Sequence, residues 1–152
     1  MRTNAVQIVF ALLLLVLAGA AEEMLPKLLG AGFPMLLSAA LVLSTVLGAP
    51  RAILFAVAAG GFEDSLSSLP VLASASFFLV AALLVRRTEH PIVATAVAYP
   101  AYQVWLAVWT SSLGGGVFGR MLVAVPLGFA AACAVWAVVF VAMRKAAVYE
   151  QD

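Results

Sequence analysis

Residues 121–143, MLVAVPLGFAAACAVWAVVFVAM, form an apolar stretch without a single charged side chain, and Arg144 and Lys145 follow it directly. A helix needs roughly 20 such residues to cross the hydrocarbon core of a bilayer. The stretch is therefore long enough to span a membrane without help from its neighbours. Basic residues directly after such a stretch are typical of the cytoplasmic face.

The composition of all 152 residues points the same way. Hydrophobic residues make up 66% of the chain and charged residues 10%, against roughly 45–50% and 25% in soluble domains. Eight basic and seven acidic side chains cannot cover a soluble domain of this size. The net charge of +1 leaves no basic patch for nucleic-acid phosphates. The sequence therefore predicts one transmembrane helical domain over residues 1–152, without a soluble domain or a nucleic-acid partner.

Charged residues and prolines divide the chain into six apolar segments: residues 4–21, 34–47, 50–66, 71–85, 91–113 and 121–143. We expect each segment to be a helix, because isolated strands leave backbone groups unpaired in lipid. Residues 34–47 and 71–85 are short for a span, so they would borrow loop residues or thin the bilayer locally. A re-entrant hairpin made of the second and third segments is the alternative. The glycine-rich residues 114–119 are expected to be a flexible loop.

The basic residues predict the orientation. If the N-terminus is cytoplasmic, the outer side holds only Lys27 and Arg120. The inner side then holds Arg2, Arg51, Arg86, Arg87, Arg144 and Lys145. This bias fits the positive-inside rule and predicts six spans with both termini in the cytoplasm. Five of these inner residues, Arg51, Arg86, Arg87, Arg144 and Lys145, are expected to anchor the chain to lipid headgroups.

The N-terminal segment has a second interpretation. Arg2, the apolar residues 5–17 and the small residues 18–20 are similar to a cleavable signal peptide. Cleavage there would leave the other five spans in the same orientation.

The third segment carries a stripe of small residues that ends in an acidic one. Ala52, Ala56, Gly60 and Asp64 recur every four residues and share one helix face. Small side chains let a second helix approach closely. Carboxylates near the hydrocarbon boundary are costly and normally face protein or a wet cavity. We expect a partner-binding seam that ends at Asp64 and Glu63; the alternative is that both carboxylates cap a solvated outer loop.

The fifth segment concentrates aromatic and polar side chains, namely Tyr99, Tyr102, Gln103 and Trp105. They lie on adjacent helix faces. Two interpretations stay open, because such residues either pack against other helices and the membrane interface or line a ligand cavity.

The sequence holds no pattern of a known catalytic site, such as HExxH, GxSxG or a P-loop. Its one histidine, His90, and its one cysteine, Cys133, are too few for a metal cluster or a catalytic triad. We therefore expect no enzymatic activity, no metal and no cofactor.

The order of these features resembles the rod shape-determining MreD family. The resemblance rests on six short spans, on Pro50-Arg51 before the third span, and on Gly60 and Asp64 at its end. A serine-rich loop over residues 65–70 follows. The last span contains a proline and ends in Met143-Arg144-Lys145.

This resemblance implies a non-enzymatic scaffold in the inner membrane of a bacterium. It implies that the chain binds the bitopic protein MreC and couples the MreB filament to peptidoglycan synthases. The stripe that ends at Asp64 would then form part of a groove for a partner helix. The family is also similar in fold to the substrate-binding subunits (S-components) of vitamin transporters. The alternative function is therefore vitamin binding in an outer cavity around Tyr99, Gln103 and Trp105.

Overall fold

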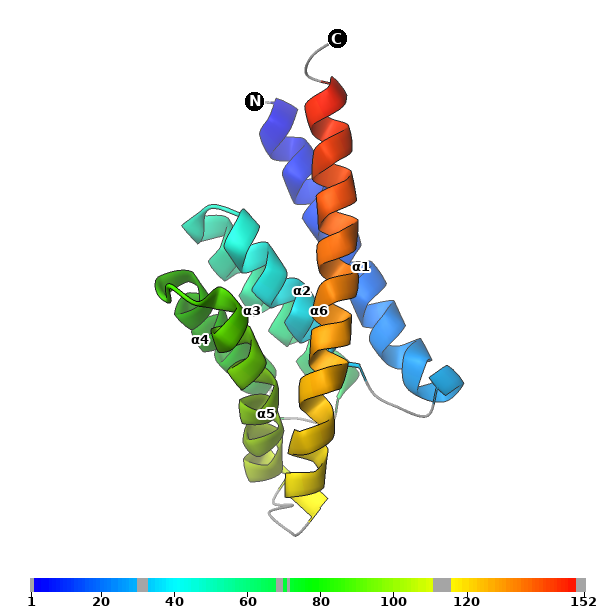
Figure 1. Ribbon diagram of the computed structural model, residues 1–152, viewed down its shortest axis with the longest axis vertical. Helices are drawn as coiled ribbons and strands as arrows, with labels where there is room; N and C mark the ends of the chain where they lie inside the picture. The colour runs from blue at the N-terminus through cyan, green and yellow to red at the C-terminus, as the bar shows by residue number, and fades with distance from the viewer. Residues whose placement is uncertain (1, 30–32, 68–69, 71, 111–115, 150–152) are drawn as a thin grey trace.

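The computed structural model describes residues 2–29, 33–67, 70, 72–110 and 116–149. These residues form six α-helices and contain no β-strand. The helices are α1 (Arg2–Leu29), α2 (Met35–Val46), α3 (Ala49–Leu66), α4 (Ala73–Arg87), α5 (Pro91–Trp109) and α6 (Gly116–Tyr149). Successive helices run in alternating directions, and the start of α1 lies at the same end of the molecule as the end of α6 (Figure 1).

Three helices are long and apolar enough to cross a membrane, with candidate spans Ile8–Leu25, Pro91–Trp109 and Leu122–Val139. Only 28%, 22% and 33% of the residues in these spans, respectively, are buried inside the molecule. The rest of their surface faces outward and is largely apolar, as expected where lipid is the solvent. The predicted all-helical class is confirmed, and so is the presence of helices with the character of membrane spans.

The helix boundaries differ from the predicted segments mainly at α1 and α6. We expected the first helix to end before Glu22 and Glu23, but α1 continues to Leu29. Glutamate has a high helix propensity, and Glu22 also receives a hydrogen bond from another helix. Helix α6 begins at Gly116, so residues 116–119 are helical and not part of a flexible loop. Residues 114 and 115 lie outside the described part of the chain.

The shortest helix, α2, lies at the centre of the bundle. Every residue from Leu36 to Ser44 is buried, and α2 packs against α1, α3, α4 and α6. A helix that is apolar on all sides is expected to be buried on all sides, and the α2 sequence MLLSAALVLSTV has that character. The other helices therefore pack around a short central helix.

Candidate functional site

Asp64, near the end of α3, caps the beginning of α4. Its Oδ1 accepts a hydrogen bond from the backbone N–H of Ser74 at 2.7 Å, and its Oδ2 accepts one from Ala75 at 3.4 Å. The N-cap residue of α4 is Leu72, which has a left-handed φ of 72° and no side-chain oxygen for capping. Because the local sequence lacks an N-cap acceptor, the neighbouring helix supplies one. The Asp64 side chain is buried in this position.

Glu22 caps α2 in the same way from α1. Its Oε2 accepts a hydrogen bond from the backbone N–H of Leu36 at 2.8 Å. The N-cap residue of α2 is Pro34, which makes no side-chain cap. Both short helices thus begin with a carboxylate that comes from another helix of the bundle.

The lengths of α2 and α4 explain why they need these carboxylates. The helices have 12 and 15 residues, or about 18 and 22 Å at 1.5 Å per residue. The hydrocarbon core is roughly 30 Å thick, so the ends of helices this short lie close to the hydrocarbon unless the bilayer thins locally. The first N–H groups of a helix lack partners inside the helix, and lipid offers none. A carboxylate satisfies them and also interacts favourably with the positive end of the helix dipole.

Glu63 and Tyr102 join the two caps into one network. The Tyr102 hydroxyl lies 3.4 Å from Glu63 Oε1, to which it donates, and 2.9 Å from Ser74 Oγ. Glu63 also lies close enough to Glu22 for the two carboxyl groups to interact electrostatically. We call Glu22, Glu63, Asp64, Ser74 and Tyr102 the capping network. It connects α1, α3, α4 and α5 at one end of the bundle.

The aromatic side chains of α5 pack against other helices. The Tyr99 and Ser38 hydroxyls lie 3.0 Å apart in a buried hydrogen bond, and Trp105 Nε1 donates to the Ala73 carbonyl at 2.9 Å. Tyr99 and Tyr102 are buried, and Gln103 and Trp105 are half-buried. The Tyr102 ring also lies 5.0 Å from that of Phe77. This arrangement favours the packing interpretation of these residues over the cavity interpretation.

The stripe of small residues on α3 forms a seam with α4 of the same chain. Ala52, Ala56, Gly60 and Asp64 are all buried. A Cβ atom added at Gly60 would overlap the backbone of Ala75, so the two helices touch at this point. Glu63 lies beside the seam and turns towards Glu22 and Tyr102. The face that we assigned to a partner helix is covered by α4 in this structure.

Arg86 has an intramolecular role that the sequence did not reveal. Its Nη1 donates to the carbonyl oxygens of Ser44 and Leu47, both at 2.6 Å, and so satisfies carbonyls at the C-terminal end of α2. A cation is also favourable at that end of the helix dipole. Arg87 is exposed and Arg51 is half-buried. The side chains of Arg144 and Lys145 lie outside the described part of the structure.

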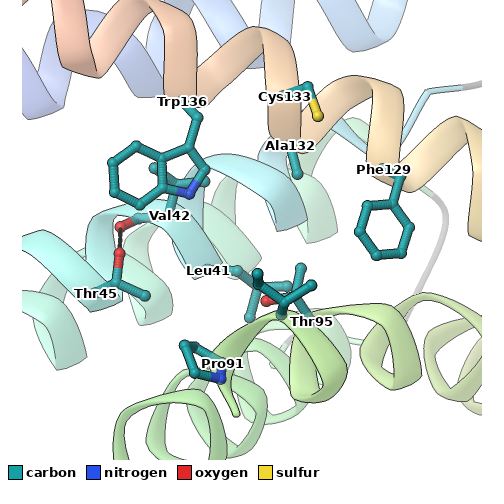
Figure 2. Close-up of a pocket in the computed structure, with 10 residues that line it drawn as sticks. Leu41, Val42, Thr45, Pro91, Thr95, Phe129, Ala132, Cys133 and Trp136 are labelled. Carbon is teal, nitrogen blue, oxygen red and sulfur yellow. Dashed lines mark hydrogen bonds between the residues drawn. The ribbon is translucent and has the colours of Figure 1, made fainter.

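An apolar cleft lies away from the capping network, between α2, α5 and α6 (Figure 2). Its volume is about 600 Å³. Its walls include Leu41 and Thr45 of α2, Pro91 and Thr95 of α5, and Phe129, Ala132, Cys133 and Trp136 of α6. None of the residues predicted to line an outer cavity belongs to it. Sequence reasoning missed this cleft because its walls come from three separate helices.

Within the described residues there is no group of three or more His, Cys, Asp or Glu side chains that could hold a metal ion. The chain matches no family model, no curated protein and no solved structure.

Proposed function

We propose that this chain is a six-span, non-enzymatic scaffold of the bacterial cytoplasmic membrane. In this proposal it belongs to the cell-shape and elongation machinery, with both termini in the cytoplasm. It binds a bitopic protein of the MreC type and couples the MreB filament to peptidoglycan synthases. The proposal joins the order of motifs that resembles the MreD family with the geometry of the capping network.

The proposal depends mainly on how the buried and half-buried carboxylates are used. Glu22, Glu63 and Asp64 are all engaged by groups of the chain itself. Substrate sites normally present convergent polar groups to a concave pocket. Here those groups fix helices to each other, which suits a rigid docking platform better than a site that binds and releases a substrate.

The alternative, vitamin binding by an S-component-like subunit, requires a polar outer cavity around Tyr99, Gln103 and Trp105. The bond between Tyr99 and Ser38 and the bond from Trp105 to Ala73 commit two of these side chains to packing. The large cleft is elsewhere and is almost wholly apolar. The scaffold is therefore the better-supported function. Saturable binding of a vitamin that is lost in Gln103→Ala would reverse this preference.

The partner helix needs a surface that α4 does not already cover. Helix α1 offers one, because Leu12, Leu13, Val16 and Leu17 on its outward side are each more than half exposed. Helix α1 packs on α2 and, to a smaller extent, on α3. We therefore place the single transmembrane helix of the partner along this outward face of α1.

Photo-crosslinking in the membrane tests this placement. A photoreactive amino acid at Leu13 should crosslink to a co-expressed MreC-type protein. The same group at Leu84, which is 60% exposed on α4, serves as the matched control and should crosslink to lipid alone. Crosslinking of the partner from Leu84 but not from Leu13 would refute the placement on α1. If the partner crosslinks from neither position and fails to co-purify with the wild-type chain, the scaffold proposal is wrong. Substitutions at Gly60 or Asp64 are unsuitable here, because they alter the seam between α3 and α4.

A further inference from the structure

The cleft between α2, α5 and α6 is lined almost entirely by carbon atoms. Thr45 and Thr95 contribute hydroxyls, Cys133 a thiol and Trp136 an indole N–H. The Thr45 hydroxyl donates to the Val42 carbonyl at 2.8 Å and is thus already engaged by its own helix (Figure 2). A volume of about 600 Å³ lies within the range of sites for small molecules, roughly 300–1,000 Å³. The lining therefore suits an alkyl chain better than a polar metabolite.

We call the end of the cleft between Thr45, Pro91 and Trp136 its mouth (Figure 2), and two of these residues lie close along the chain to basic residues or their contacts. Thr45, which lines the cleft, directly follows Ser44. Arg86 Nη1 donates a hydrogen bond to the Ser44 carbonyl oxygen at 2.6 Å. Pro91 of the facing wall begins α5, only a short turn after the end of α4 at Arg86 and Arg87. A guanidinium carries five N–H donors, of which Nη1 holds two. Arg86 can therefore hold α2 and still present donors to an anionic group at the mouth.

The size of the cleft distinguishes an acyl chain from a partner helix. A transmembrane helix about 10 Å wide and 30 Å long occupies on the order of 2,000 Å³. This is several times the volume of the cleft. A single acyl chain is much thinner and reaches the cleft laterally from the bilayer that surrounds the bundle.

We propose that this cleft binds one acyl chain of an anionic phospholipid, with the phosphate headgroup at Arg86. Leu41, Ala132 and Phe129 contact the chain, and Trp136 lies near the mouth on α6. The proposal goes beyond the scaffold function and does not depend on it, since it requires only that the chain lies in a membrane.

Lipid retention by the full-length protein tests the site. Cys133 is exposed and lines the cleft, so Cys133→Trp should fill the space with little cost to folding. Ala134 is also exposed but does not line the cleft, so Ala134→Trp is the matched control. After detergent washing, native mass spectrometry should find phosphatidylglycerol on the wild type and on Ala134→Trp, and its loss from Cys133→Trp. Equal retention by all three proteins would overturn the proposal.

A second measurement uses the unmodified chain, whose one cysteine is a natural reporter. Long-chain phosphatidylglycerol should slow the reaction of Cys133 with N-ethylmaleimide severalfold in mixed micelles. Glycerol 3-phosphate, which has the headgroup chemistry without the acyl chain, should not protect the thiol. An unchanged rate with phosphatidylglycerol, or equal protection by glycerol 3-phosphate, would contradict acyl-chain binding. Equal protection by phosphatidylcholine would contradict the role assigned to Arg86.

Discussion

At the scale of single residues, the side chains that matter most are those that satisfy the ends of neighbouring helices. Asp64 and Glu22 accept from the first turns of α4 and α2, and Arg86 donates to the last carbonyls of α2. Each of these groups supplies a hydrogen-bond partner that water would supply in solution and that lipid cannot supply. Substituting these side chains should therefore lower the free energy of unfolding before it has any other effect.

Replacing Asp64 with alanine should reveal the strength of this cap. The change leaves the N–H groups of Ser74 and Ala75 without their acceptor, which costs about 1–3 kcal/mol for a buried donor. Asp64→Asn keeps an acceptor oxygen and should cost less. The midpoint of thermal unfolding in detergent measures both variants. If Asp64→Ala unfolds at the same temperature as the wild type, the cap does not stabilise the fold.

Some of this network could be predicted from the sequence and some could not. The burial of Asp64 could be anticipated, because its spacing with Gly60 and Ala56 is visible along one helix. The partner of Glu22 is a backbone N–H in a different helix, and no periodicity reveals such a contact. The same is true of Arg86. From the sequence it is expected to anchor to lipid headgroups, and its bonds to carbonyls at the end of α2 depend on the tertiary structure.

At the scale of helices, the close approach of α3 and α4 depends on Gly60. The adjacent Gly61 has open space where a Cβ would lie, so the pair gives a matched comparison on one helix. Gly60→Ala should destabilise the fold by about 1–3 kcal/mol through overpacking. Gly61→Ala should stabilise it by up to about 1 kcal/mol through helix propensity. Thermal unfolding in detergent gives both values, and equal effects at the two positions would refute the predicted contact with Ala75.

The number and type of helices followed directly from hydropathy, whereas their lengths and contacts did not. Charged residues mark where apolar runs end, but Glu22 lies inside α1 because a neighbouring helix uses its carboxylate. The aromatic residues of α5 had two interpretations, and packing is favoured by bonds to Ser38 and to Ala73. These bonds join different helices, so the residue pattern of one segment cannot predict them.

At the scale of the whole molecule, the structure is a bundle around a short central helix. The all-round apolar sequence of α2 is consistent with its burial on every side. The apolar cleft arises where α5 and α6 lie beside the last turns of α2. The alternating directions of the helices point the C-terminal ends of α2, α4 and α6 towards the same end of the molecule (Figure 1). The basic residues near the ends of α4 and α6 are Arg86, Arg87, Arg144 and Lys145.

The central claim is that six helices cross the bilayer with this basic end in the cytoplasm, and reporter fusions in bacterial cells test it most directly. Green fluorescent protein fused after Arg87 or after Tyr149 should fluoresce. Alkaline phosphatase fused after Leu66 or after Thr110 should be active, because the proposed six-span topology places those positions on the outer side of the membrane. Active phosphatase after Arg87 together with fluorescence after Tyr149 would place the ends of α4 and α6 on opposite sides and contradict the six-span account.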